Sequence, residues 1–169
     1  MYKFNLGKKE MNSNIVCLGE QLEEILTSIY KVNSKLRWYM YDVKGSAREE
    51  TYLLSRQEQI IINDTITLIE LVRNVIQFER GVFIGTIKPI CDNEYASDTL
   101  PYTEEEEKMQ FAHAEVEIRT FDYSYFEIYC KSELMKNIIQ EDVRHRYTVS
   151  KSREEKLSIE MNKDVMLWS

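Results

Sequence analysis

Long apolar runs are missing from this chain of 169 residues. A membrane-spanning helix requires about 18 or more consecutive apolar residues, and every helical candidate here is interrupted by charged residues. The first ten residues, 1–10, contain lysines but are not followed by the apolar stretch and small-residue cleavage site of a secretory signal. We therefore expect a cytoplasmic protein with no membrane partner.

Cysteine, glycine and proline are scarce, with three, five and two residues respectively. An odd number of cysteines, at wide spacings, fits neither a disulfide framework nor a CxxC metal site. We therefore expect reduced thiols at Cys17, Cys91 and Cys130. The content of 43% hydrophobic and 30% charged residues excludes global disorder. A chain of this length forms one core by default, so the sequence predicts a single domain over 1–169.

Motifs of the common enzyme classes are also missing. The chain has no phosphate-binding loop, dinucleotide fingerprint, HExxH, GxSxG or EF-hand pattern. Its two histidines, His113 and His145, give a catalytic triad or a histidine metal site very few residues to draw on. No stripe of basic residues alternates with aromatics, which argues against a nucleic-acid partner. We expect a protein that is not an enzyme and that uses no cofactor or metal.

The net charge of −7 is concentrated in one segment. Residues 89–107 contain seven acids and no lysine or arginine, whereas acids and bases are equal in number over the rest of the chain. The seven acids are Asp92, Glu94, Asp98, Glu104, Glu105, Glu106 and Glu107. Such a segment repels a polyanion and attracts a basic protein surface.

A central strand and a long acidic connection are predicted next to each other. The nearly continuous apolar run over 80–87 is typical of a strand buried on both faces, and Pro89 ends it. The stretch 89–110 is longer than an ordinary connection, which predicts an acidic loop. Within it, the run Glu104–Glu107 is either a solvated loop or a group of charges that steers a basic partner toward the protein.

The first helix and the first strand follow from periodicity. Apolar residues at alternating spacings of four and three predict a helix over 15–32, with Ser13 or Asn14 as its N-cap. The aromatic-rich segment 36–43 predicts a strand that ends before a turn at 45–46.

A second helix is predicted over 56–77, because 55–58 has the Ser-x-x-Glu spacing of a capping box. The β-branched run 60–62 opposes this start, since such side chains lose rotamer freedom in a helix. A helix that begins at Asn63 or Asp64 is the alternative.

The end of the chain carries two further capping signals. A helix is predicted over 131–146, capped by Ser132, with Leu134 on its apolar face. A second capping-box spacing at 152–155 predicts a short helix within a C-terminal extension over 151–169.

The segment 114–130 predicts a β-hairpin with a three-residue turn at 122–124. Polar and apolar residues alternate on both sides of this turn. The register pairs Phe121 with Tyr125, Arg119 with Glu127 and Glu117 with Tyr129, because a one-residue slip would put every apolar side chain on the wrong face. One face is then apolar, and the other carries Glu115, Glu117, Arg119, Tyr125, Glu127 and Tyr129.

The predicted elements follow the order α, β, α, β, β, β, α, with a short helical tail. This order predicts an α+β fold, with a mainly antiparallel sheet of about four strands and helices packed on one side.

The polar face of the hairpin has three interpretations. It is an ordinary solvated face, a platform covered by the chain's own tail, or a docking surface for a basic protein, where Tyr125 and Tyr129 are suited to an interface. A fourth hypothesis is metal-dependent catalysis by Glu115 and Glu117 with Asp42 or Glu127. Arg119, already matched with Glu127, stands where such sites usually place a lysine.

Two segments, 78–83 and 117–129, resemble bacterial immunity proteins of contact-dependent or polymorphic toxin systems. The resemblance implies a cytoplasmic inhibitor that binds a cognate toxin domain, as an antitoxin does, and blocks its active site. Many such toxins are nucleases with basic substrate clefts, so the implied partner is a basic toxin domain. A phage-encoded inhibitory protein is the alternative, and a metal-dependent enzyme is the second alternative.

The residues that we expect to contact the partner lie in the acidic run and on the polar face of the hairpin. They are Glu104, Glu105, Glu106, Glu107, Glu115, Glu117, Tyr125, Glu127 and Tyr129.

Overall fold

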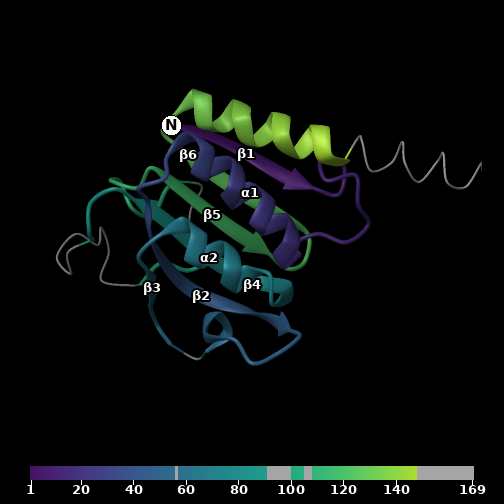
Figure 1. Cartoon of the computed structure of the whole chain (residues 1–169), viewed down its shortest axis with the longest axis vertical. Coiled ribbons are helices and arrows are strands. Elements are labelled where there is room, and N and C mark those ends of the chain that lie inside the picture. Colours follow the sequence, from purple (N-terminus) through teal and green to yellow (C-terminus); the bar gives the residue numbers. More distant parts are fainter. Residues whose placement is uncertain (56, 91–99, 105–107, 148–169) are drawn as a thin grey trace, which may run out of the picture.

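Six strands form one antiparallel sheet in the computed structural model, which describes residues 1–55, 57–90, 100–104 and 108–147 (Figure 1). The order across the sheet is β1-β6-β5-β4-β2-β3, and every neighbouring pair is antiparallel. The strands are β1 (Tyr2–Gly7), β2 (Arg37–Ala47), β3 (Ile60–Ile62), β4 (Val75–Thr86), β5 (Val116–Phe121) and β6 (Tyr125–Cys130). The helices are α1 (Gly19–Val32), α2 (Thr65–Val72), the short 3₁₀ turn η1 (Tyr52–Leu54) and a third α-helix over 133–147.

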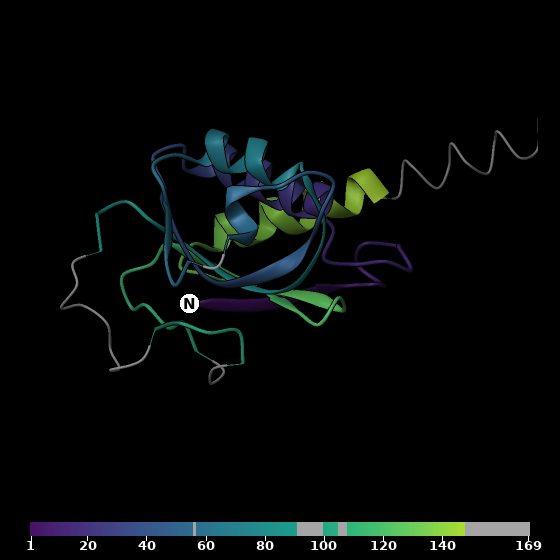
Figure 2. The same cartoon turned by 90° about the horizontal axis from the view of Figure 1, so that it is seen from below.

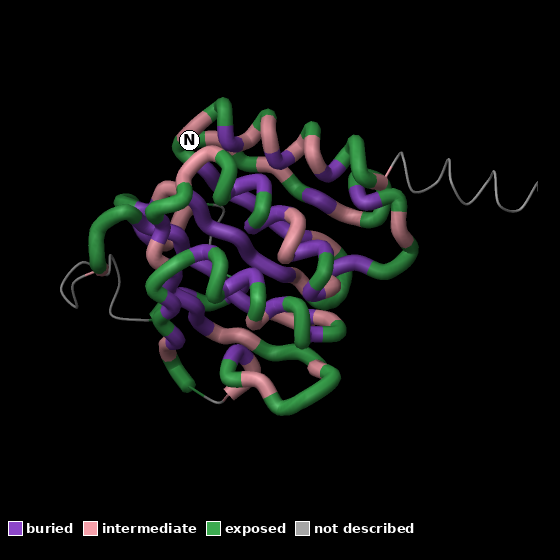
Figure 3. The backbone as a smooth tube through the Cα atoms, in the orientation of Figure 1, coloured by how far each residue is buried: buried purple, intermediate pink, exposed green. Residues whose placement is uncertain are grey.

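The three α-helices cover one face of the sheet, as Figure 2 shows from below. Their apolar residues meet those of the sheet in the main core, and the central strands are buried along most of their length (Figure 3). The core includes Leu22, Ile25 and Ile29 of α1, Val72 of α2, Ile139 and Val143 of the last helix, and Phe83, Ile118, Phe126 and Ile128 of the sheet. The α+β class is confirmed, but the sheet has six strands and not four.

The other face of the sheet is covered by the connection between β4 and β5, which lies below the sheet in Figure 2. Phe111 and Ala114 of this connection pack in a second, smaller core against Tyr39, Val82 and Ile84 of the sheet. The backbone N–H of Ile90 also donates to the Tyr39 hydroxyl at 3.0 Å. The sheet is therefore covered on both faces, by helices on one and by irregular chain on the other.

The predicted helix over 56–77 is wrong, and the alternative start is confirmed. Residues 60–62 form β3, where Ile62 pairs with Trp38 of β2. The helix begins after Asp64, whose Oδ1 accepts the backbone N–H of Thr67 at 2.8 Å. The chain then enters β4 at Val75. Pairing of β-branched residues with β2 outweighs the local capping signal.

Helix α1 begins at Gly19, later than predicted, and neither Ser13 nor Asn14 caps it. The cap is Leu18, whose backbone N–H donates to Gln21 Oε1 at 3.1 Å. Just before it, Cys17 has a φ of 62° and its carbonyl accepts the N–H of Phe78. This contact with β4 keeps the segment before Gly19 out of the helix.

Strand β2 continues through Gly45 and Ser46, where the sequence predicts a turn. Register shifts beside Lys44 and between Ser46 and Ala47 bend the strand, as β-bulges do. A Cβ atom at Gly45 would collide with the carbonyl oxygen of Gln77. The glycine therefore marks a close approach of two strands.

Strand β1 was not predicted, although its sequence carries a signal. Tyr2, Phe4 and Leu6 alternate with Lys3 and Asn5, which is the period of a strand with one buried face. In the structure this strand pairs with β6 along its whole length.

The last helix is confirmed, with Ser132 Oγ accepting the N–H of Met135 at 3.3 Å. Leu134, expected on its apolar face, is instead 61% exposed. Cys17 and Cys130 are free thiols, and burial raises their pKa to about 12 and about 11. Cys91 and the C-terminal extension over 151–169 lie outside the described residues.

The β5–β6 hairpin has the predicted register, with Phe121 opposite Tyr125 and Glu117 opposite Tyr129. In its turn, Asp122 and Tyr123 have φ values of 39° and 58°, and the N–H of Ser124 donates to the Phe121 carbonyl at 2.7 Å. Two successive positive φ angles are typical of turns that favour Asn followed by Gly. Tyrosine is therefore an unfavourable residue at position 123.

Replacing Tyr123 with glycine should raise the free energy of unfolding by about 1 kcal/mol, because a residue without a Cβ atom adopts this backbone conformation freely. Urea denaturation of both proteins measures the difference. The same replacement at Tyr30, which lies within α1, is the control and should lower the free energy of unfolding by a similar amount. A loss of stability in Tyr123→Gly would contradict the account of the turn.

Candidate partner-binding site

The polar face of the hairpin is not a free surface. Glu117, Arg119 and Tyr129 have no exposed area, and Glu127 is 6% exposed. The expectation that Glu117, Glu127 and Tyr129 are open to a partner is therefore wrong, because the β4–β5 connection lies over them and β1 lies beside β6. Of the three interpretations, the structure supports a covered platform, with this connection as the covering segment. The tail that the sequence predicted as a cover lies outside the described residues.

Arg119 lies at the centre of this face, with no access to solvent. Its Nε donates to Glu117 Oε1 at 2.8 Å, and its Nη2 lies 2.7 Å from the same oxygen. Nη2 also donates to the backbone carbonyl of Lys108, in the covering connection. One guanidinium thus binds a strand carboxylate and the connection at the same time.

Glu117 makes a second link to the connection. Its Oε2 accepts the backbone N–H of Gln110 at 2.9 Å, and its Oε1 accepts from Gln110 Nε2 at 3.4 Å. Burial raises the pKa of the Glu117 carboxyl, although Arg119 and Gln110 act in the opposite direction. The carboxylate is held by donors on three sides, which leaves it unavailable to a ligand.

Glu127 and Tyr129 extend the same group of side chains toward β1. The Tyr129 hydroxyl donates to Glu127 Oε2 at 2.7 Å, and Lys3 Nζ lies 2.8 Å from Glu127 Oε1. The Arg119 guanidinium lies over the Tyr129 ring, 4.9 Å from its centroid. Burial raises the pKa of Tyr129 to about 12, so the hydroxyl group stays protonated and remains a hydrogen-bond donor. We call Glu117, Arg119, Glu127 and Tyr129 the buried clamp, and the exposed Lys3 borders it from β1.

The carboxylates of the hairpin do not gather around a common point. Glu115 pairs with Lys131 at 3.6 Å, apart from the buried clamp, and Asp42 pairs with Arg80 at 2.9 Å. Among the residues that the structure describes, no group of three or more His, Cys, Asp or Glu side chains is arranged to hold a metal ion. The geometry gives the metal hypothesis no support.

The acidic run is held against the sheet at both of its ends. On the N-terminal side, Thr103 Oγ1 donates to Asp42 Oδ2 at 3.2 Å and accepts the N–H of Gly81 at 3.1 Å. On the C-terminal side, Gln110 bonds to Glu117. Gln110 also exchanges two hydrogen bonds of 2.9 Å with the backbone of Tyr102, which closes the base of the loop. We call residues 102–110 the anchored acidic loop.

The remaining predicted residues are placed as follows. Glu104 is exposed on the anchored acidic loop, and 105–107 lie outside the described residues. Tyr125 is half-buried, and its ring stacks on Phe121 with centroids 4.9 Å apart. The structure thus separates the predicted set into a buried group and an accessible group.

Three important residues were not identified from the sequence. Thr103 and Gln110 are ordinary polar residues of a loop, and no local pattern distinguishes them. Lys3 belongs to the strand that was not predicted, and the alternation of β1 would have placed it on this face.

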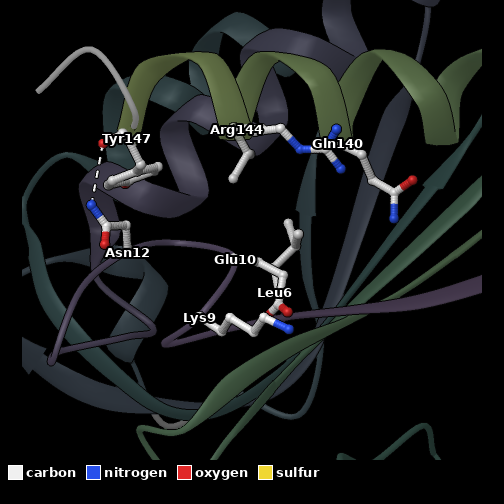
Figure 4. A pocket seen from close by; sticks show the side chains of 8 residues that line it. Leu6, Lys9, Glu10, Asn12, Gln140, Arg144 and Tyr147 are labelled. Carbon is white, nitrogen blue, oxygen red and sulfur yellow. Dashed lines mark hydrogen bonds between the residues drawn. The ribbon is translucent and has the colours of Figure 1, made fainter. Parts of the chain in front are cut away.

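A pocket of about 480 Å³ lies elsewhere, between the connection that follows β1 and the end of the helix over 133–147 (Figure 4). It is lined by Leu6, Lys9, Glu10, Asn12, Gln140, Val143, Arg144 and Tyr147. Glu10 Oε2 accepts the N–H of Gly7 at 3.0 Å, and Asn12 Nδ2 donates to the Tyr147 carbonyl at 3.4 Å. The pocket contains none of the predicted site residues, and its mixture of bases and an acid indicates no particular ligand.

No helix within the described ranges combines the length and the apolar character needed to cross a bilayer.

Replacing Arg119 with methionine should lower the free energy of unfolding by about 3–5 kcal/mol, because it leaves Glu117 buried without its counter-charge. Arg73→Met is the matched control. Its partner Glu23 lies 2.7 Å away at the surface, so the cost there should be about 0–1 kcal/mol. Urea denaturation compares the two variants, and equal losses would contradict the role of Arg119.

The pH dependence of stability tests Glu117 separately. A carboxyl whose pKa is raised by folding contributes stability that is full below its unfolded pKa of about 4.3 and declines as the pH rises through the folded pKa. The stability difference between the native protein and Glu117→Gln should therefore be larger at about pH 4 than at about pH 7. Denaturation at the two pH values measures it, and a difference that grows with rising pH would refute the shift.

Comparison with other proteins gives no further guide to the family or the activity. The chain matches no protein-family model, no curated protein and no solved structure. Of the residues predicted to contact a partner, Glu104 on the anchored acidic loop is exposed, and Tyr125 near the end of the hairpin is half-buried.

Proposed function

We propose that this chain is an immunity protein, which binds and neutralises the toxin domain of a bacterial contact-dependent or polymorphic toxin system. The observation that carries the proposal is the anchored acidic loop. Thr103 and Gln110 fix the two ends of the acidic run on the sheet, and the described acid of the run, Glu104, is exposed. The resemblance of 78–83 and 117–129 to immunity proteins supports the same function.

A loop whose two ends are held on the sheet suits this function better than a free acidic tail. Ordering a loop on binding costs free energy, and anchoring its ends before the partner arrives reduces that cost. Hydrogen bonds of the buried clamp to Lys108 and Gln110 supply the anchoring, in a region that is shielded from water. The clamp therefore acts through the position of the loop and does not itself contact the partner.

The expected partner surface is basic. Residues 89–107 carry seven acids without a lysine or arginine, so they attract a positively charged domain over a distance set by ionic screening. A nuclease toxin with a cationic substrate cleft offers such a surface. We propose that the acidic loop occupies this cleft and excludes the nucleic acid, as a mimic of its phosphate charge.

A complex with the toxin domain encoded beside this chain tests the proposal. Charge reversal at Glu104 and Glu105 should slow association on the order of tenfold, because loop charges act before contact is made. Added salt should slow association of the native protein in the same way. Stopped-flow measurement of the association rate is the appropriate experiment.

The control for charge reversal is a pair of exposed acids outside the loop. Glu49→Lys with Glu50→Lys changes the net charge equally, on a different connection, and should alter the association rate far less. If neither added salt nor charge reversal in the loop changes the affinity, the interface lies elsewhere on the molecule. Metal-dependent cleavage of nucleic acid by the purified chain would refute a purely inhibitory function.

A further inference from the structure

The end of the β5–β6 hairpin carries three aromatic residues, Phe121, Tyr123 and Tyr125. The rings of Phe121 and Tyr125 stack with an interplanar angle of 12°, and both residues are half-buried. Tyr123, at the turn between them, is 41% exposed. Tyr125 lies opposite Gly7 of β1, which has no side chain to cover this flank. The aromatic surface is therefore accessible from the end of the sheet.

Two carboxylates border these rings. Glu79 Oε2 accepts a long hydrogen bond of 3.4 Å from the Tyr123 hydroxyl, and Asp122 is exposed beside it. Neither makes an ion pair with a base in the described part of the chain, whereas Glu117 and Glu127 do. We call Glu79, Phe121, Asp122, Tyr123 and Tyr125 the hairpin-tip patch. Among the described residues these two carboxylates have no basic counter-charge, and Glu79 bonds to the hydroxyl of one of the tyrosines.

The patch also borders a surface hollow. Glu79 lines a depression of about 660 Å³ together with Asp42, Lys44, Glu58 and other residues of β2 and the following connection. Asp42 is paired with Arg80, which also lines the hollow, and the other charged residues there are Glu58, Glu79 and Lys44. The hollow offers space for a long cationic side chain next to the rings.

We propose that the hairpin-tip patch binds an arginine side chain of the basic partner and so anchors the complex. A guanidinium stacks on aromatic faces and forms paired hydrogen bonds with a carboxylate, and a patch of rings and unpaired carboxylates provides both. A lysine ammonium cannot stack in this way and is more strongly hydrated. The inference rests on the proposed function for the identity of the partner, but arginine recognition can be measured by itself.

The described base of the anchored acidic loop and two residues of the patch, Phe121 and Tyr125, lie on the same side of the sheet. Phe121 follows Arg119 on the face of the sheet that the loop covers, by the alternation of the strand. Thr103, which immediately precedes the acidic run, binds the N–H of Gly81, and Gly81 is paired with Thr120, next to Phe121. A basic partner that docks on this side of the sheet would therefore meet Glu104 and the hairpin-tip patch together.

The test is a titration of the full chain with N-acetylarginine amide, followed by amide chemical shifts in NMR spectra. We expect shifts at 79 and 121–125, and an affinity at least about fivefold above that for N-acetyllysine amide. Tyr123→Gly and Asp122→Asn should each weaken arginine binding by about fivefold or more. Both replacements suit the turn, so a loss of binding does not reflect unfolding.

Two variants serve as controls for arginine binding. Tyr30→Ala removes an exposed tyrosine on α1 and should leave arginine binding unchanged, and Tyr123→Phe keeps the ring and should retain it. Shifts confined to the acidic loop, equal affinity for the lysine probe, or full arginine binding by Tyr123→Gly would each overturn the inference.

Dissociation rates of the complex with the toxin domain distinguish the arginine anchor from the proposed function. If both are right, Tyr123→Gly should raise the dissociation rate about tenfold with little change in association, the reverse of the charge-reversal variant. A toxin complex that is indifferent to Tyr123→Gly refutes the anchor and leaves the function in place. Arginine binding at the tip by a chain that binds no toxin supports the anchor and refutes the function.

Discussion

The burial of Arg119 is the constraint on which the surface of this protein depends. A guanidinium without access to water must have its donors satisfied by the protein, and here Glu117 and the carbonyl of Lys108 accept from it. Because Lys108 belongs to the β4–β5 connection, satisfying the arginine also fixes the path of that connection. Internal charge pairing thereby determines where the external charge of the molecule is presented.

Local patterns predicted the elements whose contacts are local. The hairpin register followed from alternation alone, because its two strands are neighbours and a slip would exchange their faces. The helix predicted from the segment 55–58 was wrong because the contacts that decide the structure there are not local. Its capping spacing is a local signal, whereas the pairing of Ile60 and Ile62 with β2 is made by residues about twenty positions away and outweighs it.

The candidate site could be predicted in part, and the missing part has a physical explanation. Alternation shows which side chains share a face, and it placed Glu117, Arg119, Glu127 and Tyr129 together. It does not show what covers that face. The covering segment is irregular and is held by single polar residues such as Gln110, for which neither periodicity nor motif exists. On this face, Glu115 and Tyr125, at the two ends of the hairpin, remain partly exposed in the described chain.

The acidic loop contains residues that attach it to the sheet and a residue that is exposed. This division affects which substitutions the fold tolerates. Thr103 and Gln110 face the sheet and carry the attachment, whereas Glu104 points away from it. A substitution at Glu104 should therefore alter the exposed charge of the molecule without disturbing its core. Such an arrangement allows the exposed side chain to vary while the scaffold that holds the loop is unchanged.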